Sequence, residues 1–104
     1  MAFPLDGVKV LDFTRVLAGP FATRIMADLG ADVLKIEPPE GDMTRGIGRQ
    51  IGGISGYFTQ QNVGKRSICL DLTQPEGQAL VKRLAAEADI VAENFRPGVM
   101  AKFN

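Results

Sequence analysis

Four runs rich in β-branched and other apolar residues stand out along this chain. They cover residues 8–14, 32–37, 66–72 and 89–93. Glycine, proline and other turn-forming residues lie near their ends, which is typical of short strands inside a sheet.

Two segments between these runs carry apolar residues at helical spacing. The first begins near Gly19-Pro20, and Gly30 follows it where a C-terminal cap belongs. The second begins at residues 73–76, where Thr73 and Glu76 fit a capping box, although Gly77 weakens the helix. A further helix is expected to begin near Pro97. Strand and helix therefore alternate with short connections, which predicts an α/β fold with two strand–helix–strand units around an open parallel sheet.

Residues 38–58 differ from the rest of the chain. They hold six of the 12 glycines and show little periodicity, so we expect a long loop, of the kind that is often functional. Residues 46–52 partly match a dinucleotide fingerprint, but they lack its last close glycine and do not follow a strand. A mobile lid is the better interpretation, with a helical turn over residues 57–61.

Composition excludes several classes of protein. Twelve basic and 12 acidic residues cancel, so no basic excess points to nucleic acid or to an anionic membrane. No apolar run approaches the roughly 20 residues that span a bilayer, and the N-terminus does not read as a signal peptide. The single cysteine, Cys69, fits a reducing, cytoplasmic setting. The 104 residues suit one domain.

The chain contains no histidine, which excludes the Ser-His-Asp triad, the Cys-His dyad and histidine metal sites. One cysteine also excludes a thiolate zinc site, so we expect no metal. Chemistry is left to carboxylates, lysine, arginine, hydroxyl groups, Tyr57, Cys69 and backbone groups.

Ligands of open α/β sheets bind at the carboxyl ends of the strands. Here that rule selects residues 14–19, 37–41, 70–73 and 94–98. Residues 14–19 lead into a helix N-terminus that favours an anion such as a pyrophosphate, although any strand–helix turn shares this feature. Phe95 and Arg96 offer a ring and a cation for adenine and phosphate, or alternatively an apolar plug beside a surface charge.

Several single residues receive plainer interpretations. Lys65 and Arg66 are expected to be a solvated strand entry, and Cys69 is expected to pack inside the sheet. Arg45 and Arg49 meet either a phosphate or carboxylate or only solvent. Asp12 and Asp71 lie in strands, and neither has an evident carboxylate partner.

Four segments, taken in order and spacing, resemble the N-terminus of the family III CoA-transferases, also called the CaiB/BaiF family. The resemblance covers nearly the whole chain. The segments are Val10–Pro20, Ala27–Glu37, Asn62–Leu72 and Ala88–Gly98.

The resemblance implies a Rossmann-like large domain that binds coenzyme A, with two chains interlocked as a homodimer. Such enzymes move CoA between an acyl-CoA and a carboxylic acid, and an aspartate forms the covalent intermediates. That aspartate lies beyond the matched region, so residues 1–104 are expected to be a truncated, inactive CoA-binding domain. The aspartates that do not occupy its place are Asp12, Asp28, Asp32, Asp42, Asp71 and Asp89.

Cofactor contacts also carry over by position. The residues so implied are Val16, Leu17, Ala18, Leu70, Asp71, Leu72, Thr73, Asn94, Phe95, Arg96 and Lys102. Lys102 stands where many members have an arginine, and it keeps the charge without the bidentate geometry. Some members also have an arginine at the position of Pro38, and Arg45 is one hypothetical substitute.

Two other functions remain open. One is a fragment of a 2-methylacyl-CoA racemase-type isomerase, whose catalytic His and Asp would also lie beyond residue 104. The other is a non-catalytic CoA-binding or assembly module. The acyl substrate is not indicated by these residues.

Overall fold

A computed structural model describes residues 3–102 of the chain. Its elements, in chain order, are β1 (Lys9–Asp12), α1 (Ala18–Asp28), β2 (Asp32–Glu37), the 3-10 helix η1 (Met43–Gly46), β3 (Gln50–Ile51), β4 (Ile54–Ser55), α2 (Gly56–Asn62), β5 (Arg66–Cys69), α3 (Pro75–Glu87), β6 (Ile90–Ala92) and α4 (Val99–Lys102).

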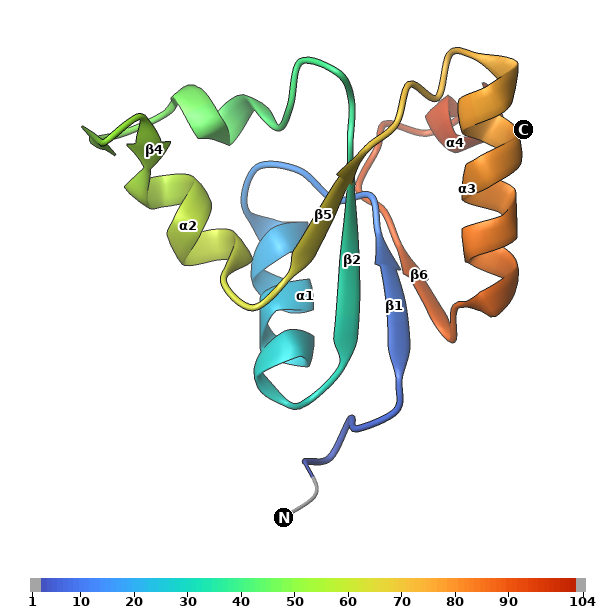
Figure 1. Cartoon of the computed structure of the whole chain (residues 1–104), viewed down its shortest axis with the longest axis horizontal. Helices are drawn as coiled ribbons and strands as arrows, with labels where there is room; N and C mark the ends of the chain where they lie inside the picture. Colours follow the sequence, from blue (N-terminus) through green and yellow to red (C-terminus); the bar gives the residue numbers. More distant parts are fainter. Residues whose placement is uncertain (1–2, 103–104) are drawn as a thin grey trace.

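The four main strands form one parallel sheet in the order β5-β2-β1-β6 (Figure 1). This order places the two earliest strands at the centre and matches four neighbouring strands of a doubly wound sheet, 3-2-1-4. All four carboxyl ends therefore lie along the same edge. The predicted α/β class, the parallel sheet and the two strand–helix–strand units are confirmed.

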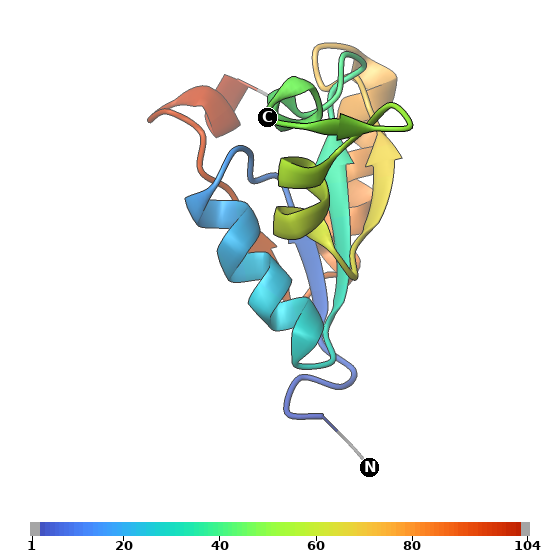
Figure 2. The ribbon, with the colours of Figure 1, turned by 90° about the vertical axis from the view of Figure 1, so that its left-hand side faces the viewer.

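Helices cover both faces of this sheet (Figure 2). Helices α1 and α2 lie on one face, whereas α3 lies on the other. Because side chains alternate along a strand, Val10 and Asp12 of β1 face α1, while Leu11 packs toward α3. The two faces have separate hydrophobic clusters, one around Leu11 and Val81 and the other around Val10 and Val33.

The region expected to be a loop contains structure. Strands β3 and β4 form a small antiparallel hairpin whose turn is Gly52-Gly53, both at positive φ (59° and 79°). Such a turn suits a two-residue hairpin, so the Gly-Gly pair was the available signal. Helix η1 and helix α2, which includes the expected turn at residues 57–61, complete the segment.

The predicted capping box of α3 is wrong. The N-cap residue is Gln74, which makes no side-chain cap, and the Thr73 hydroxyl donates to Asp71 instead. Close packing explains why a glycine stands at position 77, and the sequence did not reveal this. A Cβ atom there would lie 2.1 Å from the carbonyl oxygen of Asp71.

The strands are also shorter than expected, with β5 ending at Cys69 and β6 spanning three residues. The C-terminal cap at Gly30 is confirmed, with φ of 105°. No helix within residues 3–102 combines the length and the apolar character that crossing a membrane requires.

Candidate functional site

A cavity of about 380 Å³ opens where the carboxyl ends of the strands meet. Segments that follow all four strands contribute to it, together with the start of α4. Its lining residues are Phe13, Arg15, Ile36, Pro38, Pro39, Glu40, Leu70, Asp71, Leu72, Thr73, Phe95 and Val99. The rule that selected these strand ends from the sequence therefore found the hollow.

Aromatic rings and one cation form one side of this cavity. The rings of Phe13 and Phe95 lie 6.3 Å apart at an angle of 54°. The guanidinium carbon of Arg15 is 5.2 Å from the centre of the Phe95 ring. This distance permits a cation–π interaction and leaves a positive group beside a flat apolar surface.

The lining also includes the carboxylate of Asp71. Asp71 accepts hydrogen bonds from the Thr73 hydroxyl and from the Thr73 amide at 3.0 Å. These two bonds, the hydroxyl first, lower the pKa of Asp71. The carboxylate is therefore charged at neutral pH and suits a hydroxyl or amino donor of a ligand better than a phosphate.

The loop between β1 and α1 borders this site. Val16 has φ of 75°, in the left-handed region that a β-branched residue rarely adopts, at a cost of about 1–3 kcal/mol. Asn94 makes two hydrogen bonds to the backbone of Arg15, which precedes Val16 in this loop. Its Oδ1 accepts from the Arg15 amide at 2.9 Å, and its Nδ2 donates to the Arg15 carbonyl at 2.7 Å.

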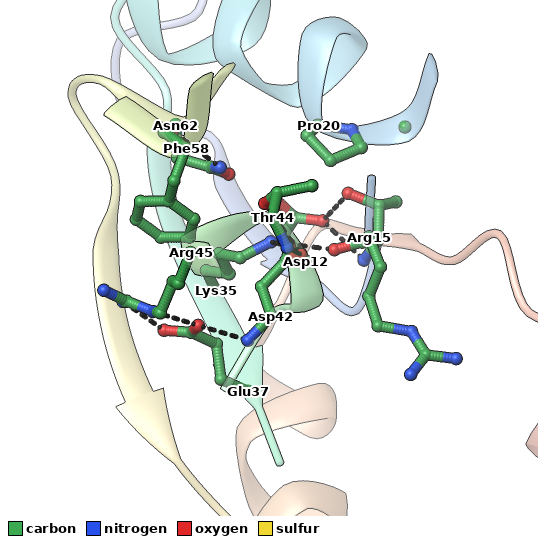
Figure 3. A network of polar contacts seen from close by, with 12 residues as sticks. Asp12, Arg15, Pro20, Lys35, Glu37, Asp42, Thr44, Arg45, Phe58 and Asn62 are labelled. Atoms are coloured by element: carbon green, nitrogen blue, oxygen red, sulfur yellow. Dashed lines mark hydrogen bonds and ion pairs between the residues drawn. The ribbon is translucent and has the colours of Figure 1, made fainter. Parts of the chain in front are cut away.

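Beneath this loop lies a network of buried charges (Figure 3). The Lys65 ammonium is 3.0 Å from Asp12, and the Lys35 ammonium is 3.0 Å from Asp42. All four side chains are at most 1% exposed. Burial lowers the pKa of Lys65, and the neighbouring Asp12 opposes that shift.

Glu37 extends the network toward α2. Burial by itself would raise the pKa of Glu37, but hydrogen bonds from Arg45, Ser67 and the Asp42 amide lower it to about 2. Arg45 contacts both carboxylate oxygens, at 2.8 and 2.7 Å, and lies 3.9 Å from the centre of the Phe58 ring. Glu37 is thus fixed as a carboxylate within the protein.

The structure gathers some of the predicted cofactor residues and not others. The same cavity is lined by five of them: Leu70, Asp71, Leu72, Thr73 and Phe95. The remaining predicted residues do not line it, and their contact with a cofactor stays a prediction. These residues are Val16, Leu17, Ala18, Asn94, Arg96 and Lys102.

Several expectations about single residues are wrong. Lys65 is buried against Asp12 rather than solvated, and Cys69 is exposed rather than packed in the sheet. Arg45 binds the Glu37 carboxylate, and its substitution for the arginine missing at Pro38 stays a prediction. Arg15 was missed as a lining residue, although its place directly after a strand was the available signal.

Among residues 3–102, no group of three or more carboxylate or cysteine side chains is placed to hold a metal ion.

Comparison with known proteins gives a consistent set of matches. The model of "CoA-transferase family III" matches residues 5–104. The acetyl-CoA:oxalate CoA-transferase of Acetobacter aceti is 51% identical over 98 residues, which are 93% of this chain and 25% of that protein. The succinyl-CoA:glutarate CoA-transferase of Homo sapiens is 48% identical over 100 residues, with 94% and 23% covered.

A solved structure agrees with the sequence matches. A CAIB/BAIF family protein from Brucella suis superposes with a TM-score of 0.92 at 48% identity, covering 99% of this chain and 29% of that one. The chain thus spans about a quarter of the length of the curated relatives it matches.

Proposed function

The chain belongs to CoA-transferase family III, and from that premise we propose that the protein containing it transfers coenzyme A between carboxylic acids. Residues 3–102 would supply part of the CoA site. The observation that carries this assignment is the cavity at the carboxyl ends of the strands, where Phe95, Arg15 and Asp71 converge.

The side chains in this cavity fit the nucleotide end of coenzyme A. The apolar wall around Phe95 suits a purine ring, and Arg15 supplies a positive charge for a phosphate. Asp71 is charged and suits a ribose hydroxyl or the adenine amino group as donor. Arg96 and Lys102, which are exposed, are further candidates for the phosphates.

The covalent step is proposed to use an aspartate outside residues 3–102. That carboxylate would attack the acyl thioester and release CoA as thiolate, giving an acyl anhydride; the thiolate would then attack the aspartyl carbonyl and release the first acid. Asp12 and Asp42 are unsuited to this role because each is buried beside a lysine. The named relatives are CoA-transferases, which favours transfer over racemisation.

An exposed apolar stripe on α1 supports the proposal that this chain packs against more protein. Leu17, Phe21, Ile25 and Leu29 recur every four residues on its outer face and are 39–50% exposed. The rest of a longer chain or the second chain of a homodimer would bury it.

Calorimetric titration of coenzyme A into the full-length protein that contains residues 1–104 tests the assignment. We expect binding that weakens about tenfold with Phe95→Ala, since a lost ring contact of about 1.4 kcal/mol has that effect. Tyr57→Phe, at a half-buried residue outside the cavity, is the control and should bind normally. Dephospho-CoA shows whether the 3′-phosphate contributes. Absence of binding by the folded wild type would refute the assignment.

A further inference from the structure

Two lysines are buried under the loop that connects β1 to α1. Lys35 binds a backbone carbonyl of that loop, and Lys65 binds a carbonyl in the first turn of α1. Lys35, on β2, donates to the carbonyl oxygen of Thr14 at 2.8 Å. Its ammonium group lies 3.0 Å from Asp42, which balances the charge. An ammonium group without such a partner would be costly to bury at this depth.

Lys65 makes a similar contact in the first turn of α1, directly after the loop. It donates to the carbonyl oxygen of Pro20 at 3.1 Å and to Asn62 at 2.8 Å. Asp12 lies 3.0 Å from its ammonium group. The two lysines, from distant parts of the sequence, thus hold the first and last residues of the segment 14–20.

Asp12 couples these two anchors. Its carboxylate accepts from the amide and hydroxyl of Thr14, and from the Thr23 hydroxyl at 2.7 Å. Asp12 also lies beside Lys35 in the register of β1 and β2. Asp12 therefore contacts both Lys65 and Thr14, the residue whose carbonyl Lys35 binds.

The loop itself needs such anchors because its conformation is unfavourable. Val16 is held at φ of 75°, and Gly19 approaches Thr14 so closely that a Cβ atom would lie 2.4 Å from the Cβ atom of Thr14. A backbone in a rarely populated conformation persists only where the surroundings fix it. A hydrogen bond from a charged group is stronger than one from a neutral group, which suits a lysine to this task.

We propose that Lys35 and Lys65 are positioning residues, whose buried ammonium groups bind the carbonyls at both ends of residues 14–20 and thereby fix the backbone that meets the cofactor. The link to the cofactor rests on the proposed function, whereas the fixing of the backbone stands on the contacts alone. Neither lysine touches the cavity, so neither is a catalytic residue.

The test removes one anchor without leaving a buried charge. The double variant Lys35→Met/Asp42→Asn is made in the full-length protein. Amide hydrogen exchange is followed over residues 14–21, and the affinity for coenzyme A is measured by calorimetry. We expect exchange to rise and affinity to fall, each about tenfold, which corresponds to about 1.4 kcal/mol.

Two controls separate positioning from general stability. Arg66→Met/Asp32→Asn removes an exposed ion pair that joins β5 to β2 at the amino ends of these strands, away from the loop. Val81→Ala weakens the core on the α3 face. Both should leave exchange at residues 14–21 and CoA affinity within about twofold of wild type, which is about 0.4 kcal/mol.

The outcomes are distinct. Unchanged exchange at residues 14–21 in the double variant, or an equal rise with Val81→Ala, would overturn the proposal. If wild type does not bind coenzyme A, the proposed function fails while the exchange experiment still decides whether the lysines fix the loop. Lys65→Met/Asp12→Asn removes the other anchor, again without leaving a buried charge, so it provides the same exchange test if the first double variant does not fold.

Discussion

The two faces of the sheet differ in the kinds of side chain that they bury. Toward α3, Leu11, Ile36 and Phe13, which follows β1, pack against the apolar side of that helix. Toward α1, the half of the face near the amino ends of the strands is also apolar. The half near their carboxyl ends holds Asp12 and Lys35 among other buried charges. The polar part lies at the carboxyl edge of the sheet, next to the candidate site.

This difference shows a division of roles. Apolar packing stabilises the fold without fixing the direction of any backbone group. Buried ion pairs contribute little net stability, because removing two charges from water offsets much of their attraction, yet they hold specific atoms at specific distances. The apolar clusters on both faces therefore account for stability, while the buried charges of the α1 face contact the backbone at residues 14–20 through Lys35 and Lys65.

The largest effect is expected from breaking one buried pair on the polar face. Lys65→Met leaves Asp12 charged and unpaired, and should lower the free energy of unfolding by about 3–5 kcal/mol in urea denaturation. Arg66→Met, at the next residue, is the matched control and should cost less than about 1 kcal/mol, because that side chain is exposed. Adding Asp12→Asn to Lys65→Met should recover part of the loss. Equal effects of Lys65→Met and Arg66→Met would contradict the comparison.

Removing a core side chain on the α3 face should lower the free energy of unfolding slightly less and leave the loop at residues 14–21 unchanged. Leu11→Ala removes a side chain that is 2% exposed, and should lower the free energy of unfolding by about 2–4 kcal/mol. Exchange at residues 14–21 measures the loop. A local increase there at matched stability would show that the two faces are not independent.

Acid should weaken the polar face selectively. The pKa of Glu37 is about 2 in the folded protein against its ordinary value of 4.5, so its charged form stabilises the fold above pH 4.5. This contribution, at most about 3 kcal/mol, is lost as the pH falls toward 2. Unfolding free energies measured from pH 6 to pH 2 should fall less steeply in Glu37→Gln than in wild type. Parallel curves would refute this role of Glu37.

The smallest effect tests the close packing of α3. Gly77→Ala should destabilise by about 1–2 kcal/mol, because the new methyl group meets the Asp71 carbonyl and outweighs the better helix propensity of alanine. Gly56→Ala, in α2, has room for a methyl group and should be neutral or mildly stabilising. Thermal unfolding of both variants is sufficient, and a stabilising Gly77→Ala would show that the backbone relaxes.

The sequence predicted the fold better than the site. Apolar periodicity predicted four strands and two principal helices, and the alternation of strand and helix predicted a parallel sheet. The strand order came only from the structure. The hairpin at residues 50–55 was not predicted because two-residue strands carry no periodicity. The capping box does not form because the Thr73 hydroxyl donates to Asp71 instead. The spacing that predicts a capping box takes no account of this competing acceptor.

The residues themselves determined the α/β class, the parallel sheet, the strand ends that form the cavity and the membership of the family. These properties depend on local periodicity and on the order of elements, both of which are written along the chain. Only the tertiary structure decided that Lys65 is buried and Arg66 exposed, and that Lys35 pairs with Asp42 rather than with its neighbour Asp12. Such choices depend on which charges meet across distant segments, because the energy of a buried charge is set by its surroundings in space rather than by its neighbours in sequence.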